Sequence, residues 1–348
     1  MSARRPLPQH AARLLGAAAD TALDRSVVLG YSRLGPLLRR PLWASDPARR
    51  DPAPGSLQGR RVVVTGATGG IGGAMAESFL ELGAIVHLLG RSPAKVADRA
   101  RELRVAHPNA EVVEEVCDVG DTEAVAQWSA DLLGRVDGLH GLVHNAGVMT
   151  KERQESPQGH ELGLAVHVLG PHVMTQALLP LLTADSGSVL WMSSGGMYTA
   201  GLHADSLDDL ENRRPEDEPY DGVRAYARTK RMQVVLADAW ARRTRGTGVL
   251  AASLHPGWAA TPGLTDALPG FDRVVGPLLR TGAEGADTAV WFVATRPSTA
   301  RGTFFHDRAP RPVHYLPVHR LRGSSDEDAA RDRFLALVAD LTGGPDLR

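Results

Sequence analysis

The protein has 348 residues, of which 43% are hydrophobic and 23% are charged, and its formal net charge is −1. Such a composition is typical of a globular chain long enough for one large domain or two small ones. The near-zero charge argues against nucleic acid as a partner, because nucleic-acid binding relies on an excess of basic residues. The single cysteine, Cys117, excludes an internal disulfide framework and fits a reducing compartment.

Residues 1–58 differ in charge from the rest of the chain, with nine arginines and four aspartates. They also contain apolar residues and end in a Pro- and Gly-containing linker at 51–56. We favour a helix that packs on the protein's own surface. The alternative is a basic amphipathic arm that makes peripheral contact with an anionic membrane. A secretory signal is not expected because Arg13 interrupts the apolar stretch, and no apolar run approaches the roughly 18 to 20 residues that cross a bilayer. We therefore expect a cytoplasmic protein, with membrane association through residues 1–58 as the open alternative.

The first predicted strand is the β-branched run 61–65, and an apolar helix is predicted over 74–82. Glycines crowd the segment between them. Glycine lets backbone N–H groups approach a pyrophosphate, and a helix N-terminus adds partial positive charge. This order of strand, glycine turn and helix predicts a dinucleotide site. The residues expected to contact the cofactor here are Thr65, Gly66, Thr68, Gly70, Ile71 and Gly72.

A second strand, predicted at 84–89, ends in Gly90-Arg91-Ser92. Proteins that bind NAD usually carry an acidic residue at this turn to hold the ribose 2′-hydroxyl. Arg91 stands there instead, and no carboxylate follows before Asp98. A guanidinium suits a 2′-phosphate, so NADP(H) is favoured over NAD(H). The alternative is that Arg91 is simply the first exposed residue after the strand.

Further strands and helices alternate along the chain. Strands are predicted at 111–119, 138–144, 188–194 and 248–254, and helices at 93–107, 121–134, 159–182 and 223–245. This alternation predicts an α/β fold, a Rossmann-type doubly wound parallel sheet of about seven strands in the order 3-2-1-4-5-6-7. We divide the chain into an N-terminal extension with linker (1–58), a single NAD(P)-binding catalytic domain (59–310) and a C-terminal tail with one helix (311–348).

Lysine is rare in this chain, which makes one lysine stand out. Only Lys95, Lys151 and Lys230 are lysines among 39 basic residues. Lys230 follows Tyr226 by four positions in the helix predicted at 223–245, so both side chains lie on one helix face. Lysine is a compact ammonium with three donors, whereas arginine is a rigid planar fork. A site that needs a point charge beside a phenol would therefore select lysine, although such a pair alone is common on protein surfaces.

Taken together, these motifs resemble the short-chain dehydrogenase/reductase family over about residues 60–310. The matching segments, in order, are Thr65-Gly66 with Gly70-Ile71-Gly72, Asn145-Ala146-Gly147, Ser193-Ser194, Tyr226 with Lys230, and Pro256-Gly257 with Thr261. Residues 193–197 and 220–226 are similar to the retinol-dehydrogenase-like group of this family. The glycine turn also fits the family's sugar-nucleotide-modifying branch, but the Asn-Ala-Gly segment and the compact C-terminal part favour the dehydrogenase branch.

The resemblance implies an NADP(H)-dependent oxidoreductase that transfers a hydride between nicotinamide and a carbonyl or alcohol. Tyr226 would be the general acid or base, and Lys230 together with the oxidised nicotinamide would lower its pKa. Lys230 would also hold the nicotinamide ribose. Ser194, rather than Ser193, would hydrogen-bond the substrate oxygen. Besides Tyr226 and Lys230, the resemblance implies cofactor contacts from Asp118, Val119, Asn145, Ala146, Gly147, Pro256, Gly257 and Thr261.

His167 departs from the family, because it aligns with the family's catalytic asparagine, which helps to hold a water in the proton relay. A neutral imidazole could hold the same water, so His167 is a candidate catalytic residue. The alternative is a packed histidine with no part in proton transfer. The histidine and the basic N-terminal segment keep a second function open, a nucleotide-binding regulatory or scaffold protein with little turnover.

Two loop regions bear on the substrate and the partners. The Pro- and Gly-rich stretch 256–282 contains apolar residues and predicts a substrate lid, which favours a lipophilic small-molecule carbonyl or alcohol. The acidic insertion 204–219 predicts a solvated loop rather than a metal site. The family further implies a homo-oligomer that forms through the helices at 159–182 and 223–245.

Overall fold

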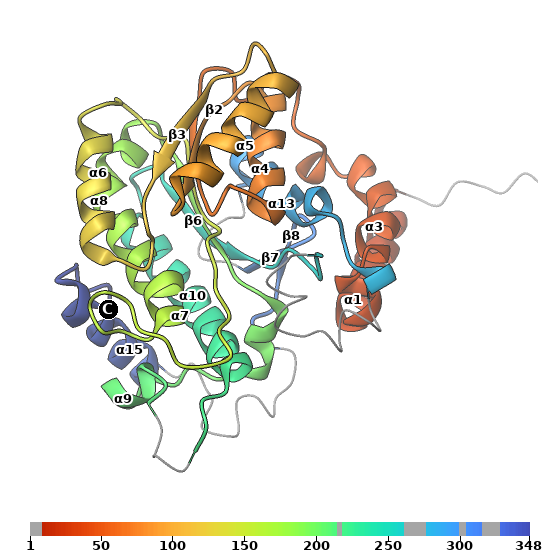
Figure 1. Cartoon of the computed structure of the whole chain (residues 1–348). Helices are drawn as coiled ribbons and strands as arrows, with labels where there is room; N and C mark the ends of the chain where they lie inside the picture. The colour runs from red at the N-terminus through yellow and green to blue at the C-terminus, as the bar shows by residue number, and fades with distance from the viewer. Residues whose placement is uncertain (1–8, 214–217, 261–275, 299–303, 315–327) are drawn as a thin grey trace, which may run out of the picture.

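The computed structural model describes residues 9–213, 218–260, 276–298, 304–314 and 328–348. Figure 1 shows a central sheet with helices on both faces. The eight strands are β1 (Arg61–Thr65), β2 (Ile85–Gly90), β3 (Val112–Val116), β4 (Gly141–His144), β5 (Ser188–Met192), β6 (Leu250–Leu254), β7 (Phe304–His306) and β8 (Ala309–Arg311).

The strands lie in the order β3-β2-β1-β4-β5-β6-β7-β8. Every neighbouring pair is parallel except β7 with β8, which is antiparallel. The predicted Rossmann-type sheet and its strand order are confirmed, and β8 adds one strand to the predicted seven. A run of three residues is too short to show the alternation of a strand, and Pro310 within it has no backbone N–H to donate. A tight turn through Asp307 and Arg308, at φ 49° and 57°, joins β8 to β7.

Helices cover both faces of the sheet (Figure 1). One face carries α4 (Gly70–Glu81), α5 (Pro93–Ala106) and α13 (Gly282–Thr295), and the other carries α6 (Thr122–Leu133), α8 (Gly170–Ala184) and α10 (Gly222–Arg243). Side chains of β1 alternate between two hydrophobic clusters: Val62 and Val64 pack on the α4 side, and Val63 packs on the opposite side. Burial on both faces explains why these strands read as continuous β-branched runs.

The helix predicted at 159–182 is interrupted. A short α7 (Leu162–Leu164) leads into a π-helical turn (Ala165–Leu169), where the N–H of Gly170 donates to the carbonyl of Ala165, and α8 follows. Pro171 has no N–H, so it cannot donate to the carbonyl four residues earlier, that of His167. The expectation that no apolar run is long enough to cross a bilayer was wrong, because Leu162–Ala184 as a whole passes that test by length and composition. However, 72% of its apolar window is buried inside the protein. It is the core helix of this fold.

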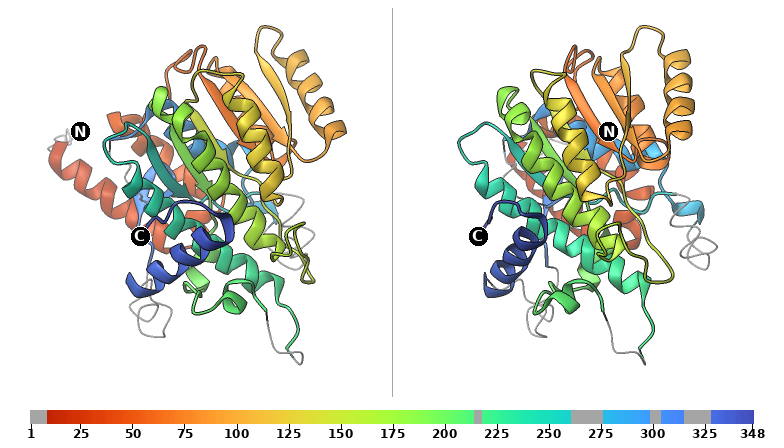
Figure 2. Two further views of the ribbon diagram at one scale, coloured as in Figure 1. Left: turned by 90° about the vertical axis from the view of Figure 1, so that its left-hand side faces the viewer. Right: turned by 60° about the vertical axis from the view of Figure 1, so that its left-hand side comes forward.

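Three helices form what we call the N-terminal arm, residues 9–45. These are α1 (Gln9–Arg25), α2 (Val28–Tyr31) and α3 (Leu34–Ser45). The arm lies against the body of the protein beside β7 and β8 (Figures 1 and 2). Buried ion pairs attach it there, with Arg311 of β8 and Arg39 of α3 both bonded to Asp20 of α1. The arm therefore packs on the protein's own surface, the arrangement favoured from the sequence.

The C-terminal helix α15 (Asp328–Thr342) packs against the π-helical turn and is linked to α10 by an ion pair. Phe334 of α15 is fully buried, and Arg331 pairs with Asp238 of α10. Nearly every side chain of α10 between Ala225 and Trp240 is buried within the single chain. These contacts cover part of the helix surface through which the family resemblance predicts an oligomer.

Candidate active site

The loops after β1 and β4 are joined at the carboxyl ends of the two strands. The hydroxyl of Thr65 accepts from the backbone N–H groups of Asn145 (3.0 Å) and Ala146 (2.9 Å). The side-chain amide of Asn145 donates to the carbonyls of Thr65 (2.9 Å) and Gly66 (3.3 Å). The predicted residues Thr65, Gly66, Asn145 and Ala146 thus form one hydrogen-bonded unit that shapes the glycine turn.

Backbone geometry explains the glycines in this turn. Gly66 has φ +67°, in the left-handed region, and a Cβ there would lie 2.9 Å from Ala146 Cα. A Cβ on Gly72 would lie 2.3 Å from the Gly66 carbonyl oxygen. By contrast, Gly69 has open space around it, and no side chain caps α4, whose first turn begins at Gly70. Bare N–H groups at the start of a long helix suit an anion, so the turn fits the diphosphate of a dinucleotide.

The outer rim of the turn carries the residues predicted to bind the adenosine part of the cofactor. Arg91 is exposed directly after β2, and Thr68 packs against Gly90 at the same strand end. Asp118 is exposed after β3, and its carboxylate accepts from the N–H of Gly120 at 2.9 Å. Val119 is buried beside it. All four predicted residues thus lie at the carboxyl ends of β1, β2 and β3.

The two serines after β5 have different surroundings. The Ser193 hydroxyl is buried and donates to the backbone carbonyl of Lys230 at 2.8 Å. The Ser194 hydroxyl is part-buried, accepts from the N–H of Gly196 at 3.2 Å, and lies near enough to the phenol of Tyr226 to lower its pKa. Ser193 therefore secures α10 against the sheet, while Ser194 is the serine beside the phenol, in agreement with the choice made from the sequence.

Tyr226 and Lys230 lie one turn apart on α10, with Lys230 Nζ 5.2 Å from the centre of the tyrosine ring. Burial raises the pKa of Tyr226 to about 12, and the hydrogen bond with Ser194 opposes this only in part. Burial also lowers the pKa of Lys230 to about 7. From the sequence, Lys230 and the oxidised nicotinamide together are expected to lower the phenol pKa, and this stays a prediction. Within the chain itself the Lys230 ammonium donates to other acceptors.

Those acceptors are two oxygen atoms. Lys230 Nζ donates to the carbonyl of Met192 at the end of β5 (2.8 Å) and to Oε1 of Gln233 (3.1 Å). Gln233 is 1% exposed, and its Nε2 donates to the backbone carbonyl of His167 at 3.0 Å. An ammonium has three donors, so one remains for another acceptor. Gln233 was not predicted as a site residue, although its position three residues after Lys230 placed it on the same helix face.

His167 lies in the π-helical turn with both ring nitrogens bonded. Nε2 accepts from the N–H of Val148 (3.0 Å), and Nδ1 lies 2.8 Å from the hydroxyl of Thr229. The Thr229 hydroxyl donates to the carbonyl of Tyr226, so Nδ1 carries the proton. Burial holds the pKa of His167 well below its ordinary value, and the charge of Lys230 acts in the same direction. A Cβ on the predicted residue Gly147 would lie 3.3 Å from Nε2. The neutral ring thus ties the segment after Gly147 to α10.

Pro256 and Gly257 follow β6 and are held from outside by Arg280. Arg280 donates to the Pro256 carbonyl at 3.2 Å, and a Cβ on Gly257, whose φ is +81°, would lie 2.2 Å from Arg280 Nε. This part of the predicted nicotinamide wall therefore requires glycine. Thr261 and most of the predicted lid fall at 261–275, outside the described residues.

Comparison with known proteins identifies the family. A model described as short chain dehydrogenase matches residues 60–203. Dehydrogenase/reductase SDR family member 12 of Homo sapiens is 34% identical over 82% of this chain and 87% of its own length. The corresponding protein of Bos taurus is 33% identical over 84% of this chain and 91% of its own. Retinol dehydrogenase 11 of Mus musculus is 28% identical over 72% of this chain and 78% of its own.

Solved structures share the fold at lower identity. A short chain dehydrogenase from Shigella flexneri matches with a TM-score of 0.59 and 23% identity, over 76% of this chain and 97% of its own length. A short chain dehydrogenase from Escherichia coli, solved in complex with NADPH, matches with a TM-score of 0.60 and 24% identity, over 74% of this chain and 100% of its own.

Proposed function

Because the chain belongs to the short-chain dehydrogenase/reductase family, whose members act on alcohols or carbonyls with NAD(P), we propose that it is an NADP(H)-dependent oxidoreductase that acts on a lipophilic small-molecule carbonyl or alcohol. The observation that carries the proposal is the position of Ser194 beside Tyr226, with Lys230 Nζ 5.2 Å from the centre of the tyrosine ring. This group lies at the carboxyl end of the sheet, where parallel α/β folds bind their ligands.

Tyr226 is the proton donor in reduction and the proton acceptor in oxidation. A phenol with pKa of about 12 is protonated at neutral pH but is a weak acid. The positive charges of Lys230 and of the bound oxidised nicotinamide would lower this pKa toward the working pH. The Ser194 hydroxyl hydrogen-bonds the substrate oxygen that Tyr226 protonates, and it stabilises the negative charge that develops on that oxygen. The bound nicotinamide would supply or accept the hydride. Lys230 keeps one donor for the nicotinamide ribose, while Met192 and Gln233 fix the ammonium.

The preference for NADP(H) rests on Arg91. Its guanidinium is exposed at the end of β2, the turn at which acidic residues of NAD-binding folds hold the ribose 2′-hydroxyl. The exposed Asp118 stands after the next strand, where it can meet the adenine. Val119 and the turn residues Thr65, Gly66, Gly70, Ile71 and Gly72 complete this half of the cofactor site.

The nicotinamide half of the cofactor site consists of Asn145, Ala146 and Gly147 after β4, Pro256 and Gly257 after β6, and Thr261. His167 supports this half from behind. Its imidazole holds Val148 and Thr229 rather than a relay water, and its freed carbonyl holds Gln233. Within the proposed mechanism we therefore assign His167 a positioning role.

The test is oxidation of NADPH against a panel of lipophilic aldehydes, ketones, retinoids and steroids, with NADH in parallel. Turnover with NADPH that Tyr226→Phe abolishes supports the proposal. Tighter binding of NADH than of NADPH contradicts the assignment of Arg91. NADPH binding without turnover on any substrate would support the second candidate, a nucleotide-binding regulatory or scaffold protein, which the unusual residue at 167 favours.

The basic N-terminal arm has an apolar outer surface that fits a peripheral membrane contact. Half of the exposed large hydrophobic side chains in the described residues lie there, at Val27, Val28, Leu29, Leu37 and Leu38. Exposed arginines flank them at 25, 33 and 40. Apolar side chains beside cations suit the interface of an anionic bilayer, so a cytoplasmic protein that docks on such a surface is the proposed location. Co-flotation with vesicles containing phosphatidylserine, compared between the wild type and Leu37→Ser/Leu38→Ser, tests this contact.

The predicted homo-oligomer stays a prediction. Within one chain, α15 already covers part of the outer surface of α10. Light scattering of the purified protein measures the state directly.

A further inference from the structure

The N-terminal arm reaches the candidate active site through Tyr31. This residue ends α2 and is 3% exposed. Its ring lies edge-on against the imidazoles of His255 (4.5 Å between ring centres) and His306 (5.1 Å). Its backbone carbonyl accepts from the N–H of Trp258 at 2.7 Å and from Arg280 at 3.0 Å. The arm therefore touches the segment that includes Pro256 and Gly257.

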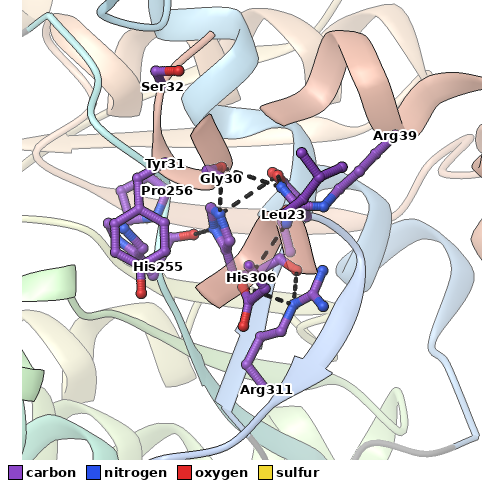
Figure 3. Close-up of polar contacts among 12 residues, drawn as sticks. Leu23, Gly30, Tyr31, Ser32, Arg39, His255, Pro256, His306 and Arg311 are labelled. Carbon is purple, nitrogen blue, oxygen red and sulfur yellow. Dashed lines mark hydrogen bonds and ion pairs between the residues drawn. The ribbon is translucent and has the colours of Figure 1, made fainter. Parts of the chain in front are cut away.

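His255 also contacts the loop after β5 that carries Ser194. The N–H of Gly195 donates to His255 Nδ1 at 3.0 Å. A Cβ on Gly195 would lie 3.0 Å from Cε2 of Tyr31 and 3.1 Å from His255 Nε2, so the backbone next to Ser194 runs directly against both rings. Figure 3 shows Tyr31 beside His255, with His306 next to Gly30 of the arm. The hydroxyl of Ser194 is thus one residue away from a contact that the arm controls.

A buried ion cluster holds the arm at this position. Asp307 pairs with Arg39 of α3 and with Arg280, the latter at 2.6 Å. The carbonyl of Gly30, one residue before Tyr31, accepts from Arg280 at 2.7 Å and from Arg39 at 3.1 Å. Because each of these groups is almost fully buried, removing a single partner leaves an unpaired charge in the interior. Tyr31 is therefore held rigidly against His255.

We propose that Tyr31 is a positioning residue of the active site, which keeps His255 neutral and thereby keeps the Gly195 N–H bonded and the Ser194 hydroxyl aimed at the substrate. This inference rests on the proposed function. A protonated imidazole has donors on both nitrogens and cannot accept from Gly195. Loss of the neutral ring would release the loop that carries Ser194.

The surroundings of His255 explain why the Tyr31 ring decides its charge. Burial holds the pKa of His255 well below its ordinary value, and the charges of His306 and Arg280 act in the same direction, while Asp307 opposes them. Replacing Tyr31 by alanine would open a cavity beside the imidazole and admit water, which restores the hydration of the charged form. The pKa of His255 would then move up toward the range near pH 6.5 that is ordinary for histidine.

The experiment compares kcat of Tyr31→Ala with kcat of the wild type at each pH between 5.5 and 8. We expect the ratio to fall by about tenfold from pH 8 to pH 5.5, since one pH unit below the pKa protonates about 90% of a group. Tyr31→Phe keeps the ring and should give a flat ratio. Asparagine has an acceptor that does not titrate, so Tyr31→Ala/His255→Asn should lose the pH step. Ala22→Ser changes an exposed residue of the same arm and should match the wild type.

A second readout does not depend on turnover. Histidine-selective NMR should show His255 silent from pH 8 to 5.5 in the wild type and titrating in Tyr31→Ala, with the Gly195 amide resonance moving in step. An active wild type with a flat Tyr31→Ala ratio and a silent His255 overturns the inference. A wild type without turnover overturns the proposed function instead, and the NMR titration still decides whether Tyr31 controls His255.

Discussion

Lys230 and Gln233 lie one turn apart on α10, and the ammonium of Lys230 donates to the side-chain oxygen of Gln233 at 3.1 Å. The same glutamine donates to the backbone carbonyl of His167 at 3.0 Å. That carbonyl is available because Pro171, four residues later, has no N–H. The side-chain amide of Gln233 therefore lies between the ammonium of Lys230 and the backbone carbonyl of His167 and bonds to both. It connects the proposed catalytic lysine to the π-helical turn.

Gln233→Met keeps the volume of the side chain but removes both hydrogen bonds. A hydrogen bond to a charged group contributes about 1.5–3 kcal/mol, so we expect kcat to fall by about 10- to 100-fold with little change in KM for the carbonyl substrate. Steady-state kinetics with NADPH measures this. Gln127→Met, an exposed change on α6, is the matched control. Wild-type kcat in Gln233→Met would show that Lys230 is positioned without the amide.

Lys230→Arg keeps the positive charge but replaces a compact ammonium by a planar fork. The acceptors at Met192 and Gln233 lie 2.8 Å and 3.1 Å from a single nitrogen, a geometry that a guanidinium cannot reproduce in a site only 3% exposed. We expect a loss of at least about 100-fold in kcat, comparable to that of Tyr226→Phe. Lys95→Arg, a change on the surface helix α5, should leave kcat unaltered. Retained turnover in Lys230→Arg would mean that charge alone suffices.

Two variants of His167 distinguish a positioning role for this residue from a role in proton relay. His167→Asn retains one acceptor and one donor, whereas His167→Ala takes the acceptor from the part-buried Val148 N–H and removes the donor to the Thr229 hydroxyl, which keeps its own bond to the Tyr226 carbonyl. We expect His167→Ala to lower the free energy of unfolding by about 1–3 kcal/mol and to reduce kcat, with His167→Asn closer to the wild type. Denaturant unfolding and kinetics are measured on the same samples. If neither variant changes kcat, His167 has no part in the mechanism.

Buried histidines make the fold sensitive to mild acid. Burial lowers the pKa of His172 to about 4, and the unfolded chain has the ordinary value near 6.5. Between these values the unfolded state binds a proton that the folded state does not, so stability is full above pH 6.5 and falls as the pH drops toward 4. His172 alone accounts for about 3 kcal/mol over this window.

The measurement is the free energy of unfolding from pH 7.5 to pH 4.5 for the wild type and for His172→Gln. Glutamine can accept from Trp240, as His172 Nδ1 does at 3.3 Å, but does not titrate. In the variant, we expect a smaller slope of unfolding free energy against pH, corresponding to the loss of up to one proton from the difference between the unfolded and folded states. An unchanged slope would show that His172 does not carry this proton linkage.

Much of the fold could be read from local sequence pattern. The first six strands are β-branched or apolar runs separated by helical periodicity, which is a local property of the chain. The strand β8 was not predicted because a run of three residues is too short to show the alternation of a strand. The π-helical turn after α7 was not predicted because it depends on the N–H that Pro171 lacks, which leaves the carbonyl one turn earlier without its helical donor. Gln233 was assigned no role, because its use depends on the orientation of Lys230.

The glycine turn and the pairing of Tyr226 with Lys230 could be predicted from the sequence because each follows from spacing within a short segment. The strand order could be predicted because alternating strands and helices indicate a doubly wound sheet. Only the tertiary structure decided which serine hydroxyl meets the phenol, where the lysine ammonium points and what the N-terminal arm does. Tyr31 and His255 meet because buried pairs such as Arg280 with Asp307 bring distant segments together. No local pattern records such a contact, since it exists only once the segments are desolvated against one another.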